Sequence, residues 1–151
     1  MKKQRRTVGA ILAIDLGEKL TAFARTLAKA EFVFYDLQLP TQDMYDLAKI
    51  VSAPTAFRLP VMDYAVKKNR WIQIGVVPLE ARLLKPQRYF IQDVISGEFS
   101  IYLNDVITSA SRSECIGLEC AAVWDPEHVE DRLRDHFAGK PNVWVEQLQP
   151  R

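Results

Sequence analysis

The sequence predicts a single α+β domain, built mostly on an antiparallel curled sheet or small open barrel with a C-terminal helix packed on it. The first hundred residues contain successive runs of β-branched and aromatic side chains separated by turn residues. A well-delimited helix follows near the C-terminus. A chain of 151 residues that is 48% hydrophobic and 26% charged fits one globular domain, and no repeat or linker divides it.

Strand-like runs open the chain after its basic start. Three such runs precede the first expected helix, at residues 10–16, 20–27 and 31–37. Gly17 and Glu18 separate the first two runs and predict a hairpin turn. A short helix is expected within residues 40–54, because Thr41 can cap it and Pro54 ends it.

The middle of the chain predicts further strands with short connections. The runs with strand composition are residues 56–64, 70–77, 88–94, 99–104 and 105–111. Pro60 marks an edge or a bulge in the first of them. Residues 65–70 read as a polar connection, and residues 78–86, bracketed by prolines, as one helical turn. Asn104 and Asp105 favour a tight turn between the last two strands.

The clearest helix of the sequence lies at residues 126–138. Asp125 is the expected N-cap, Pro126 occupies the first helical position, and Gly139 ends the helix. Apolar residues recur at four-residue steps and form one stripe: Val129, Leu133 and Phe137. The composition of residues 142–148 predicts a last, short strand.

The charge distribution excludes several classes of protein. Residues 1–6 predict a basic flexible leader with four positive charges, and the domain at residues 7–151 carries 16 basic and 19 acidic residues, a net charge of −3. A nucleic-acid binder would show a basic face on the folded part, so none is expected. The apolar run after the leader ends at Asp15, too early for a secretory signal, and no run approaches the roughly 20 apolar residues of a membrane span. The sequence therefore predicts a cytoplasmic protein.

No catalytic or metal-binding pattern stands out. Cys115 and Cys120 lack a second pair of ligands at zinc spacing and are expected to be reduced, packed side chains. His128 and His136 are eight residues apart on the expected helix, about 12 Å along its axis, so they cannot share one metal ion. Phosphate-binding, dinucleotide-binding and nucleophile-elbow motifs are missing from the sequence. No catalytic, cofactor-binding or metal residue is predicted, and no cofactor.

The acidic side of the C-terminal helix has two interpretations. Glu127, Glu130 and Asp131 lie away from its apolar stripe. They form either an ordinary solvated face or an acidic surface that meets a basic partner. Trp124, directly before the cap, would pack against its own helix and the sheet or act as an anchor at an interface.

Much of the chain resembles the bacterial immunity protein 26 family. The stretch ECIGLECAAVWDPEHVEDRLRD is similar to the family's C-terminal signature. The resemblance continues in VGAILAIDLGEKLTAFARTL, FVFYDL and RWIQIGVVPLEARLLKPQRYFIQD, and so covers most of the chain.

The resemblance implies a protein that binds and neutralises a cognate toxin of a bacterial polymorphic toxin system, a nuclease among the candidates. The expected mode is stoichiometric protein–protein interaction, through a surface that includes Trp124, Glu127, Glu130 and Asp131. Reversing the charges of Glu130 and Asp131 should then weaken binding and lower stability by less than about 1 kcal/mol. Because the family is also linked to a small phosphotriesterase, a phosphotriester hydrolase is the alternative, and a general interaction domain is a third class. The oligomeric state and the toxin's chemistry stay open.

Overall fold

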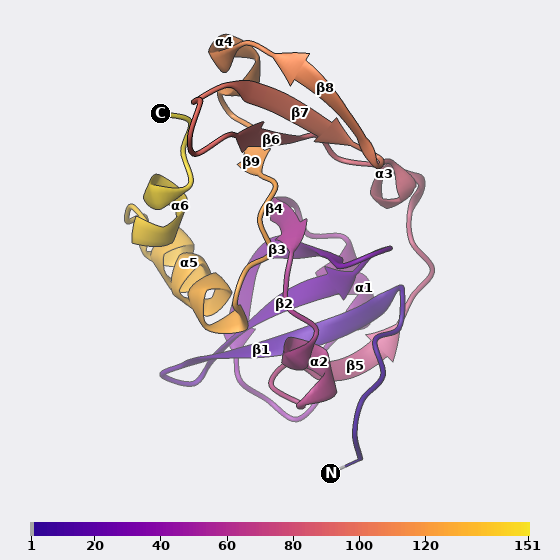
Figure 1. The fold of residues 1–151 in the computed structure, drawn as a ribbon. Coiled ribbons are helices and arrows are strands. Elements are labelled where there is room, and N and C mark those ends of the chain that lie inside the picture. Colours follow the sequence, from indigo (N-terminus) through magenta and orange to yellow (C-terminus); the bar gives the residue numbers. More distant parts are fainter. Residues whose placement is uncertain (1) are drawn as a thin grey trace.

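The computed structural model describes residues 2–151, which form two sheets and six short or medium helices (Figure 1). The strands of the first sheet are β1 (Ala10–Gly17), β2 (Leu20–Thr26), β3 (Glu31–Pro40), β4 (Thr55–Pro60) and β5 (Ile72–Val76). The strands of the second sheet are β6 (Tyr89–Gln92), β7 (Phe99–Leu103), β8 (Val106–Ala110) and β9 (Glu119–Cys120). The helices are α1 (Leu47–Val51), α2 (Tyr64–Lys67), α3 (Ala81–Leu84), α4 (Arg112–Cys115), α5 (Pro126–Ala138) and α6 (Val143–Gln147). The predicted α+β class is confirmed, with the strands divided between two sheets.

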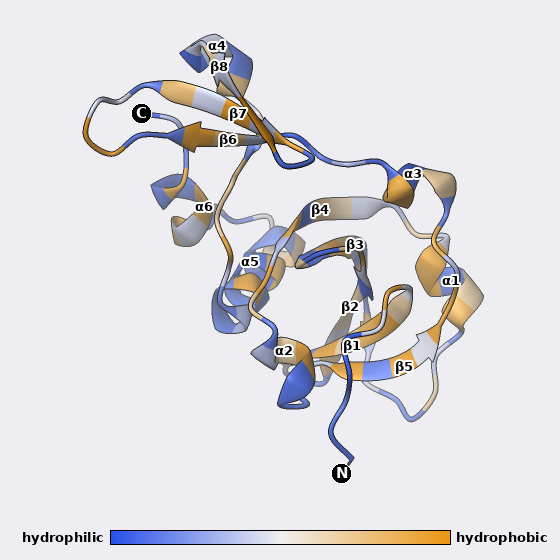
Figure 2. Cartoon of the chain, turned by 45° about the vertical axis from the view of Figure 1, so that its right-hand side comes forward, coloured by the Kyte–Doolittle hydropathy of each residue, from blue (hydrophilic) through white to orange (hydrophobic). Residues whose placement is uncertain are grey.

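The first sheet is antiparallel, in the order β4-β3-β2-β1-β5, and it is curled but not closed within the described residues (Figure 2). The predicted first hairpin is confirmed, with Glu18 and Lys19 both at positive φ between β1 and β2. Each of the four strand pairings carries a register shift. Such irregularities increase the local twist and bend, and they account for the curl.

The first sheet is buried on both faces. On one face, residues of β1, β2 and β3 pack with Trp71 and with Val129 and Leu133 of α5. On the other face, Ile11 and Phe23 pack with Ile50 of α1. The apolar stripe of α5 therefore covers the sheet as predicted, and it places the opposite side of the helix toward solvent or toward the segment before β5.

The second sheet has the order β8-β7-β6-β9, with β9 parallel to β6. The predicted tight turn is confirmed, since Asn104 and Asp105 have φ values of 48° and 68°. Cys115 of α4 packs with Phe90 and Ile101 on the face of this sheet that points away from the first sheet.

Three local predictions fail. The short helix is capped by Asp46 and not by Thr41, because the Asp46 carboxylate accepts hydrogen bonds from the first-turn amides. Residues 65–67, predicted to belong to a polar connection at residues 65–70, lie in α2. Residues 142–148 form α6 and not a strand, because the Asn142 side chain caps a helix by accepting from the Val145 amide. By contrast, α5 begins and ends as predicted, with Gly139 in the left-handed conformation at its end.

The chain segment before the first strand lies against the domain. The Gln4 side chain donates to the carbonyl oxygens of Val66 and Trp71 and accepts from the amide of Gln73. Met1, the first residue of the predicted leader, lies outside the described residues. In residues 2–151 no helix combines the length and the apolar character needed to cross a membrane.

Candidate functional site

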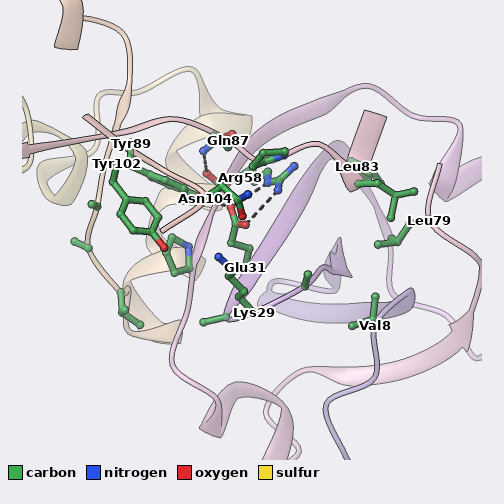
Figure 3. A pocket seen from close by; sticks show the side chains of 18 of the residues that line it. Val8, Lys29, Glu31, Arg58, Leu79, Leu83, Gln87, Tyr89, Tyr102 and Asn104 are labelled. Carbon is green, nitrogen blue, oxygen red and sulfur yellow. Dashed lines mark hydrogen bonds and ion pairs between the residues drawn. The ribbon is translucent and has the colours of Figure 1, made fainter. Parts of the chain in front are cut away.

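A cleft of about 600 Å³ lies between the two sheets. Figure 3 looks into it, with Tyr89 and Tyr102 of the second sheet on one side and Leu79 and Leu83 on the other. Most of its wall is apolar, and the linker between β9 and α5 contributes residues 121–123. The cleft therefore lies where β6 and β7 face the first sheet, with α3 and the linker before α5 also contributing to its wall.

A network of paired polar side chains crosses the cleft. Arg58 on β4 donates to both oxygens of the Glu31 carboxylate, from Nε at 3.1 Å and from Nη2 at 3.2 Å. The hydroxyl of Tyr89 donates to the same carboxylate. Burial, and then the hydrogen bond to Glu31, raise the pKa of Tyr89 well above its usual range. Because these groups bind one another, they fix the spacing of the two sheets.

A second set of contacts joins the tip of the β7–β8 hairpin to the first sheet. Asp105 accepts from the hydroxyl of Tyr102 at 2.6 Å and pairs with Nζ of Lys29 at 2.9 Å. These two contacts, in that order, lower the pKa of the Asp105 carboxyl. We call Lys29, Tyr102 and Asp105 the hairpin clamp.

The exposed side of α5 carries two of the predicted partner-binding residues. The side chains of Glu127 and Asp131 are each 48% exposed and lie about one turn apart. Glu127 accepts from the Tyr64 hydroxyl at 2.5 Å, and this contact lowers the pKa of Glu127 and raises that of Tyr64 to about 12. Asp131 accepts from Arg134 at 3.1 Å and from the Trp144 indole at 3.0 Å.

The other two predicted residues lie beneath this surface. Trp124 is buried, and its backbone joins the end of β4, where its amide donates to Pro60 and its carbonyl accepts from Met62. Glu130 is also buried, with its side chain 7% exposed. The expectation that Glu130 belongs to an exposed acidic face is therefore wrong. Whether any of these residues binds a partner stays a prediction.

Glu130 is buried because its neighbours supply hydrogen bonds that replace water. Arg70 donates to its two carboxylate oxygens, at 2.7 Å from Nε and 2.8 Å from Nη2. The fully buried Trp71 donates to it from the indole nitrogen at 3.0 Å. A buried carboxylate is tolerated when it is paired in this way. Glu130 therefore fastens α5 to the segment before β5.

The histidines and cysteines occupy separate structural positions. His128 stacks on the Trp144 ring at 3.6 Å, and His136 lies 2.8 Å from Asp36. Both thiols are free, with Cys115 buried and Cys120 partly buried. Burial raises the pKa of each thiol. Across residues 2–151, no group of three or more His, Cys, Asp or Glu side chains has the arrangement of a metal site.

No pattern in the sequence predicts the cleft. Glu31 and Tyr89 meet across 58 residues of chain, and Lys29 and Asp105 across a longer separation. The strand pattern places Tyr89 and Tyr102 on one face of a sheet, but it does not show which surface this face opposes. The cleft therefore depends on how the two sheets are placed.

Comparison with known proteins identifies the family. The sequence model of immunity protein 26 matches residues 7–101, which hold the whole first sheet and most of the cleft. The C-terminal stretch that resembles the family's signature lies outside the matched residues. Neither a search of curated proteins nor a search of solved structures found a match. Since the matched residues make up well over half of the chain, this protein belongs to the immunity protein 26 family.

Proposed function

We propose that this protein is a cytoplasmic bacterial immunity protein that binds a cognate polymorphic toxin in a stoichiometric complex and neutralises it without a cofactor. The family match over residues 7–101 is the observation that carries the proposal. A domain of this size can supply the roughly 1,200–2,000 Å² that a stable complex buries in total.

The toxin-facing surface in this proposal includes the N-terminal half of α5. Glu127 and Asp131 are the exposed carboxylates that would meet basic groups of the toxin, and opposed charges accelerate association and fix orientation. Trp124 and Glu130 lie beneath this surface and support it, because their hydrogen bonds hold α5 and its preceding linker in place.

The role is tested by affinity capture followed by a protection assay. The tagged protein is incubated with a lysate of its source organism, and retained proteins are identified by mass spectrometry. We expect the C-terminal domain of one large secreted protein at close to equal stoichiometry. That domain, expressed in bacterial cells, should stop growth, and co-expression of this protein should restore it. Recovery of the bait alone, from cells shown to express their toxins, would contradict the proposal and direct the work to a chromogenic phosphotriester.

The contact surface is tested with charge reversals. The double variant Glu127→Lys, Asp131→Lys should slow association with the captured toxin domain at least about tenfold. The charge-matched control is Asp43→Lys, Glu98→Lys, which alters two exposed carboxylates in the β3–α1 and β6–β7 loops and should leave the association rate within about twofold. Equal rates for the two double variants would show that α5 is not part of the interface.

A further inference from the structure

The second sheet ends in a strand whose outer edge is open. Among the described strands, β8 lies at the end of its sheet and pairs with β7 alone. Residues 106–109 are exposed, and the register with β7 is unbroken. The strand VITSA contains neither charge nor proline. Proteins usually protect an edge strand with charges, proline or a bulge, and β4 of the first sheet has Arg58 and ends at Pro60. The β8 edge, defined as residues 106–110, has none of these protections.

The backbone of the β8 edge presents free hydrogen-bonding groups. Leu103 and Val106 flank the two-residue turn and face each other across the hairpin. In an antiparallel hairpin closed by such a turn, this pair is hydrogen-bonded, and the pairs alternate from there. Ile107 and Ser109 therefore direct their N–H and C=O groups away from β7. These are the groups that an added strand would use.

The side chains connect this edge to the cleft. Tyr89, Tyr102 and Ile107 face one another across β6, β7 and β8, so they share one face of the sheet. Both tyrosines line the cleft, and Ile107, 61% exposed, extends the same surface to the free edge. Tyr102 thus lies between the rest of the cleft and the β8 edge, on one face of the sheet.

The hairpin clamp connects the β7–β8 turn to the turn between β2 and β3. Asp105, in the turn between β7 and β8, is bonded to Tyr102 and to Lys29 in the turn between β2 and β3. A strand that is ordered before binding loses less conformational entropy when a partner adds to it.

We infer that an extended segment of the toxin adds to β8 as a fifth strand and places an apolar side chain in the cleft beside Ile107. The inference rests on the proposed function and deepens it by naming the contact. A polypeptide in extended conformation is the occupant whose N–H and C=O groups repeat at the spacing of the β8 edge. Residues 121–123 line the cleft and precede Trp124 and α5 in the chain, so the linker before α5 forms part of the proposed contact surface.

The size of the surface favours a toxin over a second copy of this chain. One side of a standard interface comprises about 20–30 residues. A copy joined through β8 alone would contribute the five residues of the strand. A toxin segment that also fills the cleft reaches the 19 residues that line it.

The test uses a variant that removes one backbone N–H group that points away from β7, with little other change to the strand. Ser109→Pro eliminates the outward N–H, and proline is tolerated on an edge strand when its nitrogen faces away from the sheet. Binding to the captured toxin domain should weaken about 10- to 100-fold, since one hydrogen bond between the strands is lost and a carbonyl of the toxin strand is left buried and unpaired. Ser109→Ala keeps the amide and should bind within about threefold. Ile107→Lys should also weaken binding, whereas Ile95→Lys, in the exposed turn between β6 and β7, should not.

The outcomes separate this inference from the proposed function. Wild-type protein that fails to bind any toxin domain would overturn the proposed function and this inference with it. Normal binding by folded Ser109→Pro would overturn the inference alone. If that variant shifts the thermal midpoint by more than about 3 °C, hydrogen exchange of the wild-type complex decides instead. We expect the Ile107 and Ser109 amides to exchange more slowly in the complex, and unchanged exchange rates would refute the inference. A wild-type dimer in sedimentation that Ser109→Pro abolishes would assign the edge to a second copy.

Discussion

Replacing Glu130 with alanine should destabilise this protein far more than its place on a charged helix would imply. The change leaves the indole N–H of the fully buried Trp71 without an acceptor, which costs about 1–3 kcal/mol. It also removes the ion pair with Arg70, and because Arg70 is 40% exposed we assign that pair about 0.5–1 kcal/mol. The free energy of unfolding should therefore fall by about 1.5–4 kcal/mol.

Urea unfolding followed by circular dichroism measures this change, and thermal unfolding should show a midpoint lower by roughly 5–12 °C. Glu127→Ala, one turn earlier on α5 and half exposed, is the matched control, with an expected loss below about 1 kcal/mol. Glu130→Gln keeps an acceptor for Trp71 and should give an intermediate value. A loss of less than about 1 kcal/mol for Glu130→Ala would refute the reasoning, because it would mean that water already solvates this carboxylate.

Three further predictions follow from other buried or paired groups. Arg25 is fully buried and donates to three backbone carbonyls, so Arg25→Met should lower the free energy of unfolding by about 3–5 kcal/mol in urea titrations, and a loss below about 1 kcal/mol would contradict this. The lowered pKa of Asp105 means that its bonds, including the pair with Lys29, stabilise the fold above the ordinary value of 3.8 and that this contribution is lost as pH falls through the lowered pKa. The stability difference between wild type and Asp105→Asn should therefore shrink in acid, and a difference that grows would refute it. Because burial raises the pKa of Cys115 and Cys120, a thiol reagent at neutral pH should react slowly with the native protein and rapidly in urea, and equal rates would contradict the packing.

Several elements were predictable because their signals are local. The N-cap, the proline at the first position and the glycine at the end delimit α5 within its own sequence. The residues of a two-residue turn likewise predict the β7–β8 hairpin. Residues 142–148 show the limit of such signals, because their composition favours a strand while the Asn142 side chain caps a helix. There, one capping hydrogen bond and packing against α5 outweigh a weak intrinsic preference.

The amino-acid sequence by itself determined the α+β class, the hairpins and the apolar stripe of α5, since each depends on side chains a few residues apart. Tertiary structure alone decided the division of strands into two sheets, the cleft between them and the burial of Glu130. Periodicity shows which side of a helix is apolar, but it does not show what covers the other sides. Glu130 is covered because Arg70 and Trp71, about 60 residues earlier, supply its hydrogen bonds, and only the folded chain brings these three side chains together.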